Sequence, residues 1–459
     1  MYFGFQEDEQ VKLYYSKLFN TNIGKYLYDS LSNSLYKIDE KFYNLINSEN
    51  IDTENKKYYD DYISEYNIRD VLTPSEIEID HAYNSYNIKN LVDNHRRLLI
   101  LSVTNKCNMD CTYCTYHEKF SNPNNKNDTM SFEIATKAID NMIKKSLNLQ
   151  QIHVGFYGGE SLLEFELIKK CVNYTNSKGI GIINSFGLTT NGTLLFDAEI
   201  RRYFEDYNFQ ICISLDGPKS IHDRYRITHA GKGSYDSVIE NIKLWYAENP
   251  EYVLKNVLIN TVYAPPFHHK AIDDFFMEFP LNNGYNSLSP TSFFINNVND
   301  YQNEYANKVI TRRNTVYSDK YNDMAIDLYK NLYREEAIPQ MLIPGGPCIP
   351  IFQRWYINSK GDYYPCESVD ESEEFCIGNV ETDVNYEKII NIIDKYINTA
   401  KNKCKNCWAF RLCGRCYKNI NDDCIKYLIN LEKQCINYIE NVKDDKKAKE
   451  KLDYEKYYI

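Results

Sequence analysis

The sequence lacks three features that would place the protein at a membrane or on a nucleic acid. No apolar run approaches the roughly 18 residues that a membrane-spanning helix needs. The first ten residues, MYFGFQEDEQ, contain no basic segment followed by an apolar stretch, the pattern of a secretory signal. Basic residues number 53 against 64 acidic ones, a formal charge of −11, whereas binding to a phosphate backbone needs a clustered basic surface. We therefore expect a cytoplasmic protein with no membrane and no nucleic-acid partner.

Cysteine, in contrast, is abundant. The 459 residues correspond to about three domains and are 43% hydrophobic and 25% charged, which is ordinary for a globular chain, but they include 14 cysteines. In a reducing compartment, clustered cysteines usually bind metal or take part in chemistry. Two clusters occur, at 107–114 and 404–416. The isolated Cys171 and Cys212 lie in apolar segments and are expected to be buried.

Hydrophobic patterning divides the chain into segments. In the first of them, KYLYDS and NSLYKID predict two strands joined by a turn, and EKFYNLIN has the spacing of a helix. From about residue 95, apolar runs alternate with amphipathic helical segments; the predicted strands are 98–103, 152–157, 183–190, 209–215, 255–263 and 292–295. This alternation predicts an α/β fold, a parallel sheet curled into a partial barrel, with its chemistry at the carboxyl ends of the strands. The expected domains are 1–90, a barrel at 91–300, a bridging helical segment at 301–345, a Cys-rich domain at 346–440 and a helix or tail at 441–459.

The first cysteine cluster, CNMDCTYC, directly follows the first barrel strand. Its spacing, C-x3-C-x2-C for Cys107, Cys111 and Cys114, differs from the paired C-x2-C units of zinc sites. Three thiolates leave one iron of a four-iron cluster open to another ligand. Polar motifs follow the later strands: YGGES (157–161), LTTNGT (188–193), ISLDGP (213–218) and HDRYR (222–226).

In this order, the motifs resemble those of the radical S-adenosylmethionine (SAM) enzymes. The resemblance implies a partial (β/α)6 TIM-type barrel and a [4Fe-4S] cluster on the three cysteines, whose open iron binds SAM. It also implies a set of SAM-binding residues, namely Tyr113, Gly158, Gly159, Glu160, Asn191, Ser214, Asp216 and Arg226. The two glycines would allow close backbone approach, and Glu160 could pair with the SAM ammonium. Arg224 is the alternative to Arg226 as the partner of the SAM carboxylate.

The second cysteine region has enough thiolates for two further clusters. Its cysteines are, in order, Cys348, Cys366, Cys376, Cys404, Cys407, Cys413, Cys416, Cys424 and Cys435. A zinc ribbon on the four cysteines between 404 and 416 is one interpretation. The layout also resembles the SPASM extension of radical SAM proteins, which carries auxiliary [4Fe-4S] clusters.

The SPASM resemblance implies two ligand sets and three clusters in all. Cys348, Cys366 and Cys416 would hold the first auxiliary cluster, and Cys404, Cys407, Cys413 and Cys435 the second. The chain departs from the family pattern at CGRC, which has two residues between its cysteines instead of three, and this leaves the cluster served by Cys416 open. Cys424 is the alternative to Cys435, and Cys376 is either a fourth ligand of the first cluster or a core thiol.

The resemblance is strongest to maturases that form thioether crosslinks in Cys-rich ribosomal peptides (sactipeptide and ranthipeptide synthases). It implies a winged-helix-like domain at 1–90 that binds the leader of a precursor peptide by adding a strand to its sheet, the alternative being a simple cap on the barrel. An external one-electron donor such as flavodoxin or ferredoxin would also be needed. Carbon–carbon crosslinking, epimerisation and anaerobic sulfatase maturation remain alternative activities, and a non-catalytic iron–sulfur or zinc protein is the alternative from another class.

Overall fold

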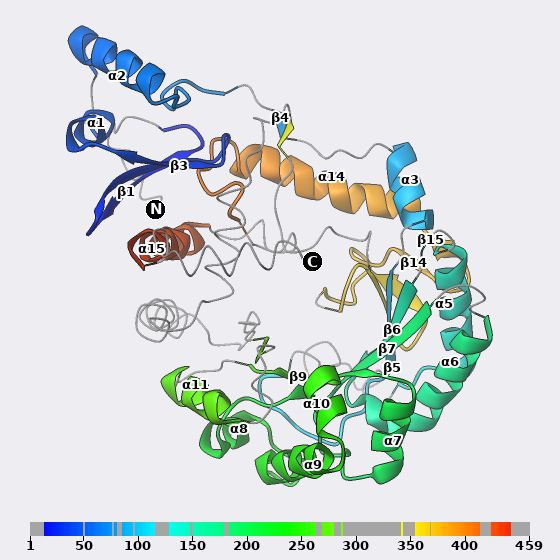
Figure 1. Cartoon of the computed structure of the whole chain (residues 1–459). Helices are drawn as coiled ribbons and strands as arrows, with labels where there is room; N and C mark the ends of the chain where they lie inside the picture. The colour runs from blue at the N-terminus through cyan, green and yellow to red at the C-terminus, as the bar shows by residue number, and fades with distance from the viewer. Residues whose placement is uncertain are drawn as a thin grey trace, which may run out of the picture. The chain divides into compact units, whose positions relative to one another are not determined.

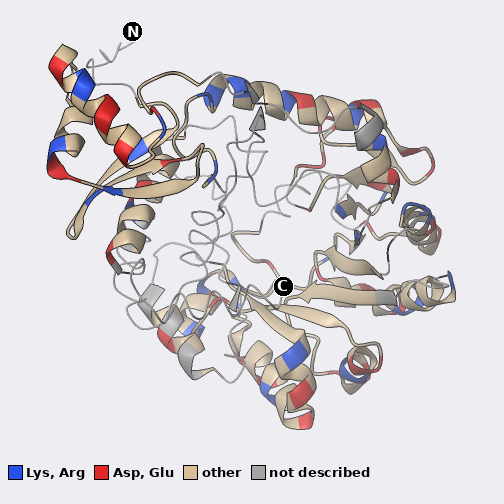
Figure 2. Ribbon diagram, turned by 45° about the horizontal axis from the view of Figure 1, so that its top comes forward, with Lys and Arg blue, Asp and Glu red and all other residues tan. Residues whose placement is uncertain are grey.

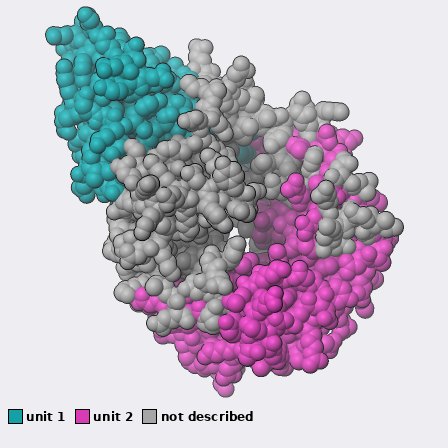
Figure 3. Space-filling model, viewed as in Figure 1, with its two compact units in different colours: residues 1–82, 306–348, 394–459 teal, residues 83–305, 349–393 magenta. Residues whose placement is uncertain are grey.

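The computed structural model describes residues 13–48, 51–75, 78–79, 85–94, 97–114, 128–146, 149, 151–178, 183–262, 269–279, 286–287, 341–342, 354–367, 369–413 and 424–441. The chain forms two compact units (Figure 3). Unit 1 combines residues 1–82, 306–348 and 394–459, and unit 2 combines 83–305 and 349–393. The N-terminal segment and the last cysteines therefore belong to one unit, although they lie at opposite ends of the sequence.

Unit 2 is built on a parallel sheet whose strands follow one another in chain order. The strands are β5 (Leu98–Thr104), β6 (Gln151–Gly158), β7 (Ile183–Thr190), β8 (Gln210–Ser214), β9 (Val257–Asn260) and β10 (Asn286–Ser287). Each pairs in parallel with the next. This arrangement confirms the predicted α/β class and the partial barrel. The predicted strand 292–295 lies outside the described residues.

Helices lie along one side of these strands (Figure 1). They are α3 (Ser85–Asn94), α5 (Phe132–Lys144), η1 (Ser161–Glu164), α6 (Phe165–Lys178), α7 (Ala198–Asp206), α8 (Lys219–Tyr225), α9 (Tyr235–Glu248), α10 (Pro250–Asn256) and α11 (His269–Glu278). In α5, for example, the Ser131 side chain accepts a hydrogen bond from the Ile134 N–H and caps the helix. Buried Ala135, Ala138 and Met142 then recur at helical spacing. Cys171 is buried in α6 as expected, whereas Cys212 in β8 is only half-buried.

A later segment extends the same sheet beyond β5. Strand β12 (Arg354–Ile357) pairs in parallel with β5, and β13 (Asp362–Tyr364), β14 (Gly378–Asn379) and β15 (Asp383–Val384) continue antiparallel. Strand β5 is therefore an interior strand, and the fully buried Trp355 and Tyr363 stack at the junction.

Unit 1 contains a three-stranded antiparallel sheet of β1 (Ser16–Thr21), β2 (Gly24–Asp29) and β3 (Ser34–Ile38). The two predicted strands and the predicted helix, α1 (Glu40–Ile46), are confirmed; β1 and the full length of α2 (Thr53–Glu65) were not predicted. Residues of β2 alternate between two apolar clusters. Leu27 packs with α1 and α2, while Tyr26 and Tyr28 pack with α15 (Ile425–Asn441). The sheet is thus covered on both faces.

The remaining elements are β4 (Glu78–Ile79), paired in parallel with β11 (Met341–Leu342), and α14 (Tyr386–Lys403). No helix within the described ranges is long and apolar enough to cross a membrane. Figure 2 shows Lys and Arg interleaved with Asp and Glu along the described helices. Apart from β11, the segments predicted at 301–345 and 441–459 lie almost wholly outside the described residues.

Candidate active site at the strand ends

The first cysteine loop leaves the carboxyl end of β5 and is held by backbone hydrogen bonds. The Asp110 N–H donates to the Ile227 carbonyl at 2.7 Å, and the Thr112 N–H donates to the Tyr225 carbonyl at 3.1 Å. Met109 and Thr228 form an antiparallel bridge beside these bonds. The loop therefore has the local geometry of a strand pair, which fixes the backbone that carries the three cysteines.

The thiols on this loop lie in a weakly solvated environment. Burial raises the pKa of Cys107 to about 12 and that of Cys111 to about 11. Thiolate ligation would therefore require a bound cation to stabilise the negative charge. Among the described residues, no three Cys, His, Asp or Glu side chains form a preformed metal-binding group. The assignment of Cys107, Cys111 and Cys114 as ligands rests on their motif and their common loop.

Two glycines at the end of β6 bring the backbone against the start of the same loop. Gly158 has φ +139°, and a Cβ there would lie 2.1 Å from the Thr104 carbonyl oxygen. A Cβ on Gly159 would lie 2.3 Å from the Lys106 carbonyl oxygen. Only glycine is compatible with this close approach, which packs the end of β6 directly against the backbone that leads into the cysteines.

Glu160 is completely buried and firmly held. Its Oε1 accepts hydrogen bonds from the Leu162 N–H at 3.0 Å and the Thr190 hydroxyl at 2.8 Å, and its Oε2 accepts one from the Asn191 N–H at 2.7 Å. Burial raises its pKa, although these three donors oppose that shift. The result is a rigid carboxylate at the ends of β6 and β7.

Asn191 connects the end of β7 to the cysteine loop. Its Nδ2 donates to the Asn108 Oδ1 at 2.7 Å, and the Asn108 Nδ2 donates to the Thr193 hydroxyl at 2.9 Å. Asn191 Nδ2 also lies 3.9 Å from the Cys107 sulfur. An amide donor near that sulfur would stabilise a thiolate. Asn108 was not among the predicted site residues, although it lies inside the cysteine motif itself.

Tyr113, Asp216 and Arg226 form a connected buried group. The Tyr113 hydroxyl donates to Asp216 Oδ2 at 2.5 Å and accepts from Arg226 Nη1 at 2.8 Å. Among the described residues, Arg226 Nε has no hydrogen-bond partner although it is buried. Burial raises the pKa of Asp216, and the Arg226 charge opposes the shift. Arg224 is exposed, so within HDRYR it is Arg226 that the structure brings to the cysteine loop.

His222 is a further residue of the site that sequence analysis did not single out. Its Nδ1 accepts from the Asp216 N–H at 3.3 Å, and its Nε2 lies 2.9 Å from the Ser234 hydroxyl. Burial, together with the Arg226 charge, lowers its pKa to about 3, so the ring is neutral. The place of His222 in HDRYR, just after a strand end, was the sequence signal from which it could have been predicted. Ser214 is buried at the last position of β8, in register with Asn260 of β9.

Residues 101–276 match the Radical SAM superfamily model. This part of the chain is a radical SAM domain. Such a domain implies SAM and one [4Fe-4S] cluster as cofactors. Two features fit them: the cysteines share one loop, and a buried guanidinium nitrogen of Arg226 remains available for an anionic group.

The chain is also similar, over most of its length, to anaerobic sulfatase-maturating enzymes. It is 26% identical to a cysteine-type enzyme of Clostridium novyi, over 70% of this chain and 88% of the relative. It is 27% identical to the cysteine-type enzyme of Clostridium perfringens, over 75% of this chain and 94% of the relative. The structure "Native anSMEcpe with bound AdoMet" superimposes with a TM-score of 0.57 and 20% identity, covering 76% of this chain and all of that one. The fold of this chain is therefore the radical SAM α/β fold.

The second cysteine group of the chain is divided between the two units. Cys366 follows β13 in unit 2, whereas Cys404, Cys407, Cys413, Cys424 and Cys435 belong to unit 1. Cys348 and Cys416 lie outside the described residues. Cys435 is buried in an apolar cluster that Cys407 also contacts, and burial raises the pKa of both thiols, with Cys413 and Cys424 acting electrostatically on Cys407. Cys376 is half-buried, and its thiol donates to the Gly378 carbonyl.

Proposed function

We propose that this radical SAM protein installs thioether crosslinks, from cysteine sulfur to carbon, in a ribosomally synthesised Cys-containing precursor peptide. The observation that carries the proposal is the three-stranded sheet with its following helix, at residues 16–46, in addition to a radical SAM domain. A small sheet of this kind suits capture of an extended peptide by strand addition.

The edge strand β3 is the proposed docking position for the leader of that peptide. Among the described residues, β3 pairs only with β2, so its other edge can accept a strand. Leu35 and Tyr36 are half-buried and face opposite sides of the sheet, and Lys37 is exposed. An added strand would extend both apolar faces while its backbone bonds to β3.

Bound SAM and a reduced four-iron cluster would supply a 5′-deoxyadenosyl radical, which removes hydrogen from a carbon of the peptide. Cys107, Cys111 and Cys114 would hold that cluster. Glu160 would accept from the SAM ammonium, and Arg226 would bind its carboxylate through the available Nε. Tyr113, Asn191, Ser214 and Asp216 would line the same pocket, with the Gly158 and Gly159 backbone beneath it.

Each thioether removes two hydrogens from the peptide, so an electron has to leave the site. We propose that two auxiliary clusters receive it, one held by Cys348, Cys366 and Cys416 and the other by Cys404, Cys407, Cys413 and Cys435. A flavodoxin or ferredoxin would deliver the electron that starts each cycle.

Formylglycine formation in a sulfatase is a second candidate. Its support is the pair of cysteine-type sulfatase-maturating relatives, which match 70% and 75% of this chain. Both candidates begin with hydrogen removal near a substrate cysteine, and they differ in the fate of the sulfur. A thioether keeps it in the peptide, whereas formylglycine loses it.

Mass spectrometry separates these products. The protein is coexpressed anaerobically with a short Cys-rich test peptide, and separately with a peptide carrying the maturation-site cysteine of a sulfatase. A Cys107/Cys111/Cys114→Ala variant is the matched control, and all products are reduced before cysteine alkylation. We expect the Cys-rich peptide to lose two hydrogens per event and to become protected from alkylation in the wild type alone.

Other outcomes point elsewhere. Loss of sulfur from the sulfatase peptide, with the Cys-rich peptide unchanged, replaces thioether formation by sulfatase maturation. Loss of two hydrogens with every cysteine still alkylated indicates carbon–carbon coupling. An unchanged mass with an inverted α-carbon indicates epimerisation.

A further inference from the structure

The second cysteine loop, residues 404–413, is attached to the N-terminal sheet by hydrogen bonds in both directions. The Tyr15 N–H donates to the Asn406 carbonyl at 3.2 Å. The Arg411 Nη2 donates to the Leu31 carbonyl at 3.0 Å, across 380 positions of sequence. Both contacts lie within unit 1. The loop therefore depends for its position on residues near the start of the chain.

Apolar contacts also connect the second cysteine loop to the N-terminal sheet. Tyr15 and Leu31 are fully buried in a cluster with Phe410, and Cys404 packs against it. On the sheet face toward α15, Phe19 and Tyr28 share a cluster with Cys435, and Cys407 and Trp408 pack against that cluster. Two apolar surfaces of the N-terminal sheet thus border three of the cysteines proposed to hold the second auxiliary cluster.

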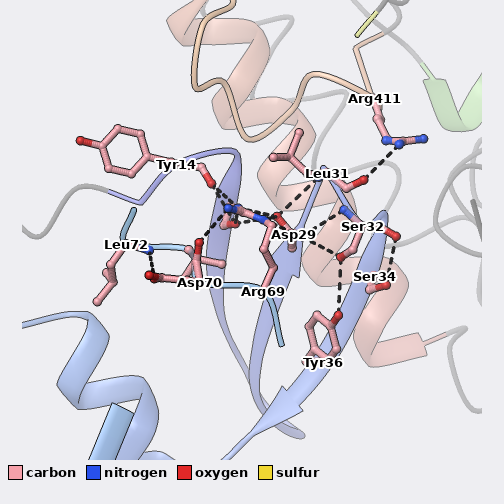
Figure 4. Close-up of polar contacts among 12 residues, drawn as sticks. Tyr14, Asp29, Leu31, Ser32, Ser34, Tyr36, Arg69, Asp70, Leu72 and Arg411 are labelled. Carbon is pink, nitrogen blue, oxygen red and sulfur yellow. Dashed lines mark hydrogen bonds and ion pairs between the residues drawn. The ribbon is translucent and has the colours of Figure 1, made fainter. Parts of the chain in front are cut away.

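The turn that carries Leu31 is itself fixed by a buried ion pair (Figure 4). Asp29 is fully buried, and its Oδ1 lies 2.8 Å from Arg69 Nη2. The same Arg69 nitrogen donates to the Tyr14 carbonyl at 2.7 Å, and Nη1 donates to the Asp70 carbonyl at 2.8 Å. Asp29 also accepts from the Ser32 N–H at 3.0 Å. One guanidinium therefore fixes the segment before Tyr15 and the turn before Leu31, the two points that hold the cysteine loop.

We infer that Arg69 and Asp29 are positioning residues for the second auxiliary cluster, and that this cluster assembles only on a folded N-terminal sheet. The inference rests on the proposed assignment of that cluster to Cys404, Cys407, Cys413 and Cys435. It gives the N-terminal segment a second role besides peptide docking. Removing the segment would then impair iron binding and peptide binding together.

The test counts auxiliary iron alone. In a Cys107/Cys111/Cys114→Ala background, Arg69→Met and Asp29→Asn are each compared with Arg201→Met. Arg201 supplies the control because its guanidinium is also buried, forms an ion pair of 2.7 Å with the more exposed Glu248, and donates to backbone carbonyls in unit 2. We expect each test variant to lose about four irons per chain, with loss of one cluster signal in Mössbauer spectra, and Arg201→Met to lose none. Arg69→Lys, which keeps the charge, should recover part of the signal.

Two outcomes separate failure of this inference from failure of the proposed function. If Arg69→Met retains all auxiliary iron, the positioning role is wrong and the cluster assignment stands. If the Cys107/Cys111/Cys114→Ala protein itself binds no iron, the proposal of auxiliary clusters is wrong, and the positioning role of Arg69 and Asp29 is wrong with it.

A second measurement tests the same coupling in the opposite direction, from the cysteine loop to the N-terminal sheet. It does not depend on whether the Arg69 or Asp29 variants fold. In full-length Cys404→Ala, loosening of the loop should speed hydrogen exchange of the Tyr15 amide, which donates to Asn406, by at least tenfold. The Tyr28 amide, inside the β-ladder, serves as the internal reference. Unchanged exchange at Tyr15 would overturn the coupling.

Discussion

The two cysteine loops of this protein are held in different ways. The loop at 107–114 is paired through its backbone with residues 225–228, inside the unit that forms the barrel. The loop at 404–413 is held to segments almost 400 positions earlier by one backbone bond, from the Tyr15 N–H to the Asn406 carbonyl, and by the side chain of Arg411, which donates to the Leu31 carbonyl. Backbone pairing survives most side-chain substitutions, whereas a side-chain anchor is lost with one. The first loop should therefore tolerate side-chain changes at 225–228, and the second should be sensitive to loss of the Arg411 side chain.

The largest effect is expected from removing the first set of thiols. In Cys107/Cys111/Cys114→Ala, production of 5′-deoxyadenosine from SAM after dithionite reduction should fall to background, because no ligands remain for the SAM-binding cluster. Auxiliary iron should remain, since the second loop belongs to unit 1. Chromatography of deoxyadenosine, together with iron analysis, checks both statements. Residual deoxyadenosine above a no-enzyme blank contradicts the assignment.

A methyl group at Gly159, where the end of β6 packs against the cysteine loop, should be nearly as damaging. Gly159→Ala forces a Cβ to within 2.3 Å of the Lys106 carbonyl oxygen, so the backbone beside the cysteine loop has to move. A displacement of this size is expected to slow SAM cleavage by ~100-fold. Gly155→Ala, within the preceding strand β6, is the control, because its nearest contact would be an ordinary 3.7 Å. Equal rates for the two variants would show that the backbone contact at Gly159 does not position the SAM site.

Single cysteine substitutions would refine the ligand set of the second loop. We expect Cys435→Ala to lower iron content by up to about four atoms per chain and Cys424→Ala to leave it unchanged. Cys435 is buried in the apolar cluster that Cys407 also contacts, which supports Cys435, whereas the electrostatic effect of Cys424 on Cys407 supports the alternative ligand. Iron analysis and Mössbauer spectra of both variants decide, and the opposite result would assign Cys424 as the ligand.

The smallest expected effect is a difference in acid sensitivity between the units. His222 has a pKa lowered to about 3 by burial and the Arg226 charge. Its stabilising contribution is therefore lost as the pH falls below about 6.5, where the unfolded histidine takes up a proton. Asp29 also has a lowered pKa, because its bonds to Arg69 and Ser32 outweigh its burial, but its contribution persists until about pH 4. As the pH falls, unit 2 should therefore lose stability before unit 1 does.

Tryptophan fluorescence can follow each unit separately. Trp245 and Trp355 lie in unit 2 and Trp408 lies in unit 1, so variants keeping one set report on one unit. Between pH 7 and 5, unit 2 of the wild type should lose about 2 kcal/mol more stability in urea than unit 2 of His222→Asn. The raised pKa values of Glu160 and Asp216 act in the opposite direction but are common to both chains. The same loss in both proteins would exclude His222 as its source.

The barrel was predictable because its signals are local. An apolar run such as LLILSV predicts one strand, and a motif such as YGGES predicts one strand end. The pairing of β12 with β5 was not predictable, since a four-residue strand carries no information about a partner so distant in sequence. Strand β1 was missed because SKLFNT is short and only partly apolar.

The site residues also divide into those with a local sequence signal and those that depend on contacts between distant segments. Glu160, Asp216 and Arg226 were found from motifs, and the structure brings them to the cysteine loop. His222 and Asn108 act through hydrogen bonds to other site residues, at Asp216 and Asn191. Such bonds are visible only once the strand ends have been brought together. The dependence of the second cysteine loop on Arg69 was invisible for the same reason.

The composition of unit 1 also has a consequence for biosynthesis. The N-terminal sheet is translated well before α15, which covers one of its two apolar faces, with Phe19, Tyr26 and Tyr28. That partner is translated about 400 residues later, ~20–80 s at ordinary elongation rates. During this interval the aromatic face is available to chaperones, to other nascent chains or to a peptide. Iron delivery to the second cysteine loop would have to follow translation, because the loop acquires its supporting sheet and its complete thiol set only when synthesis has passed Cys435.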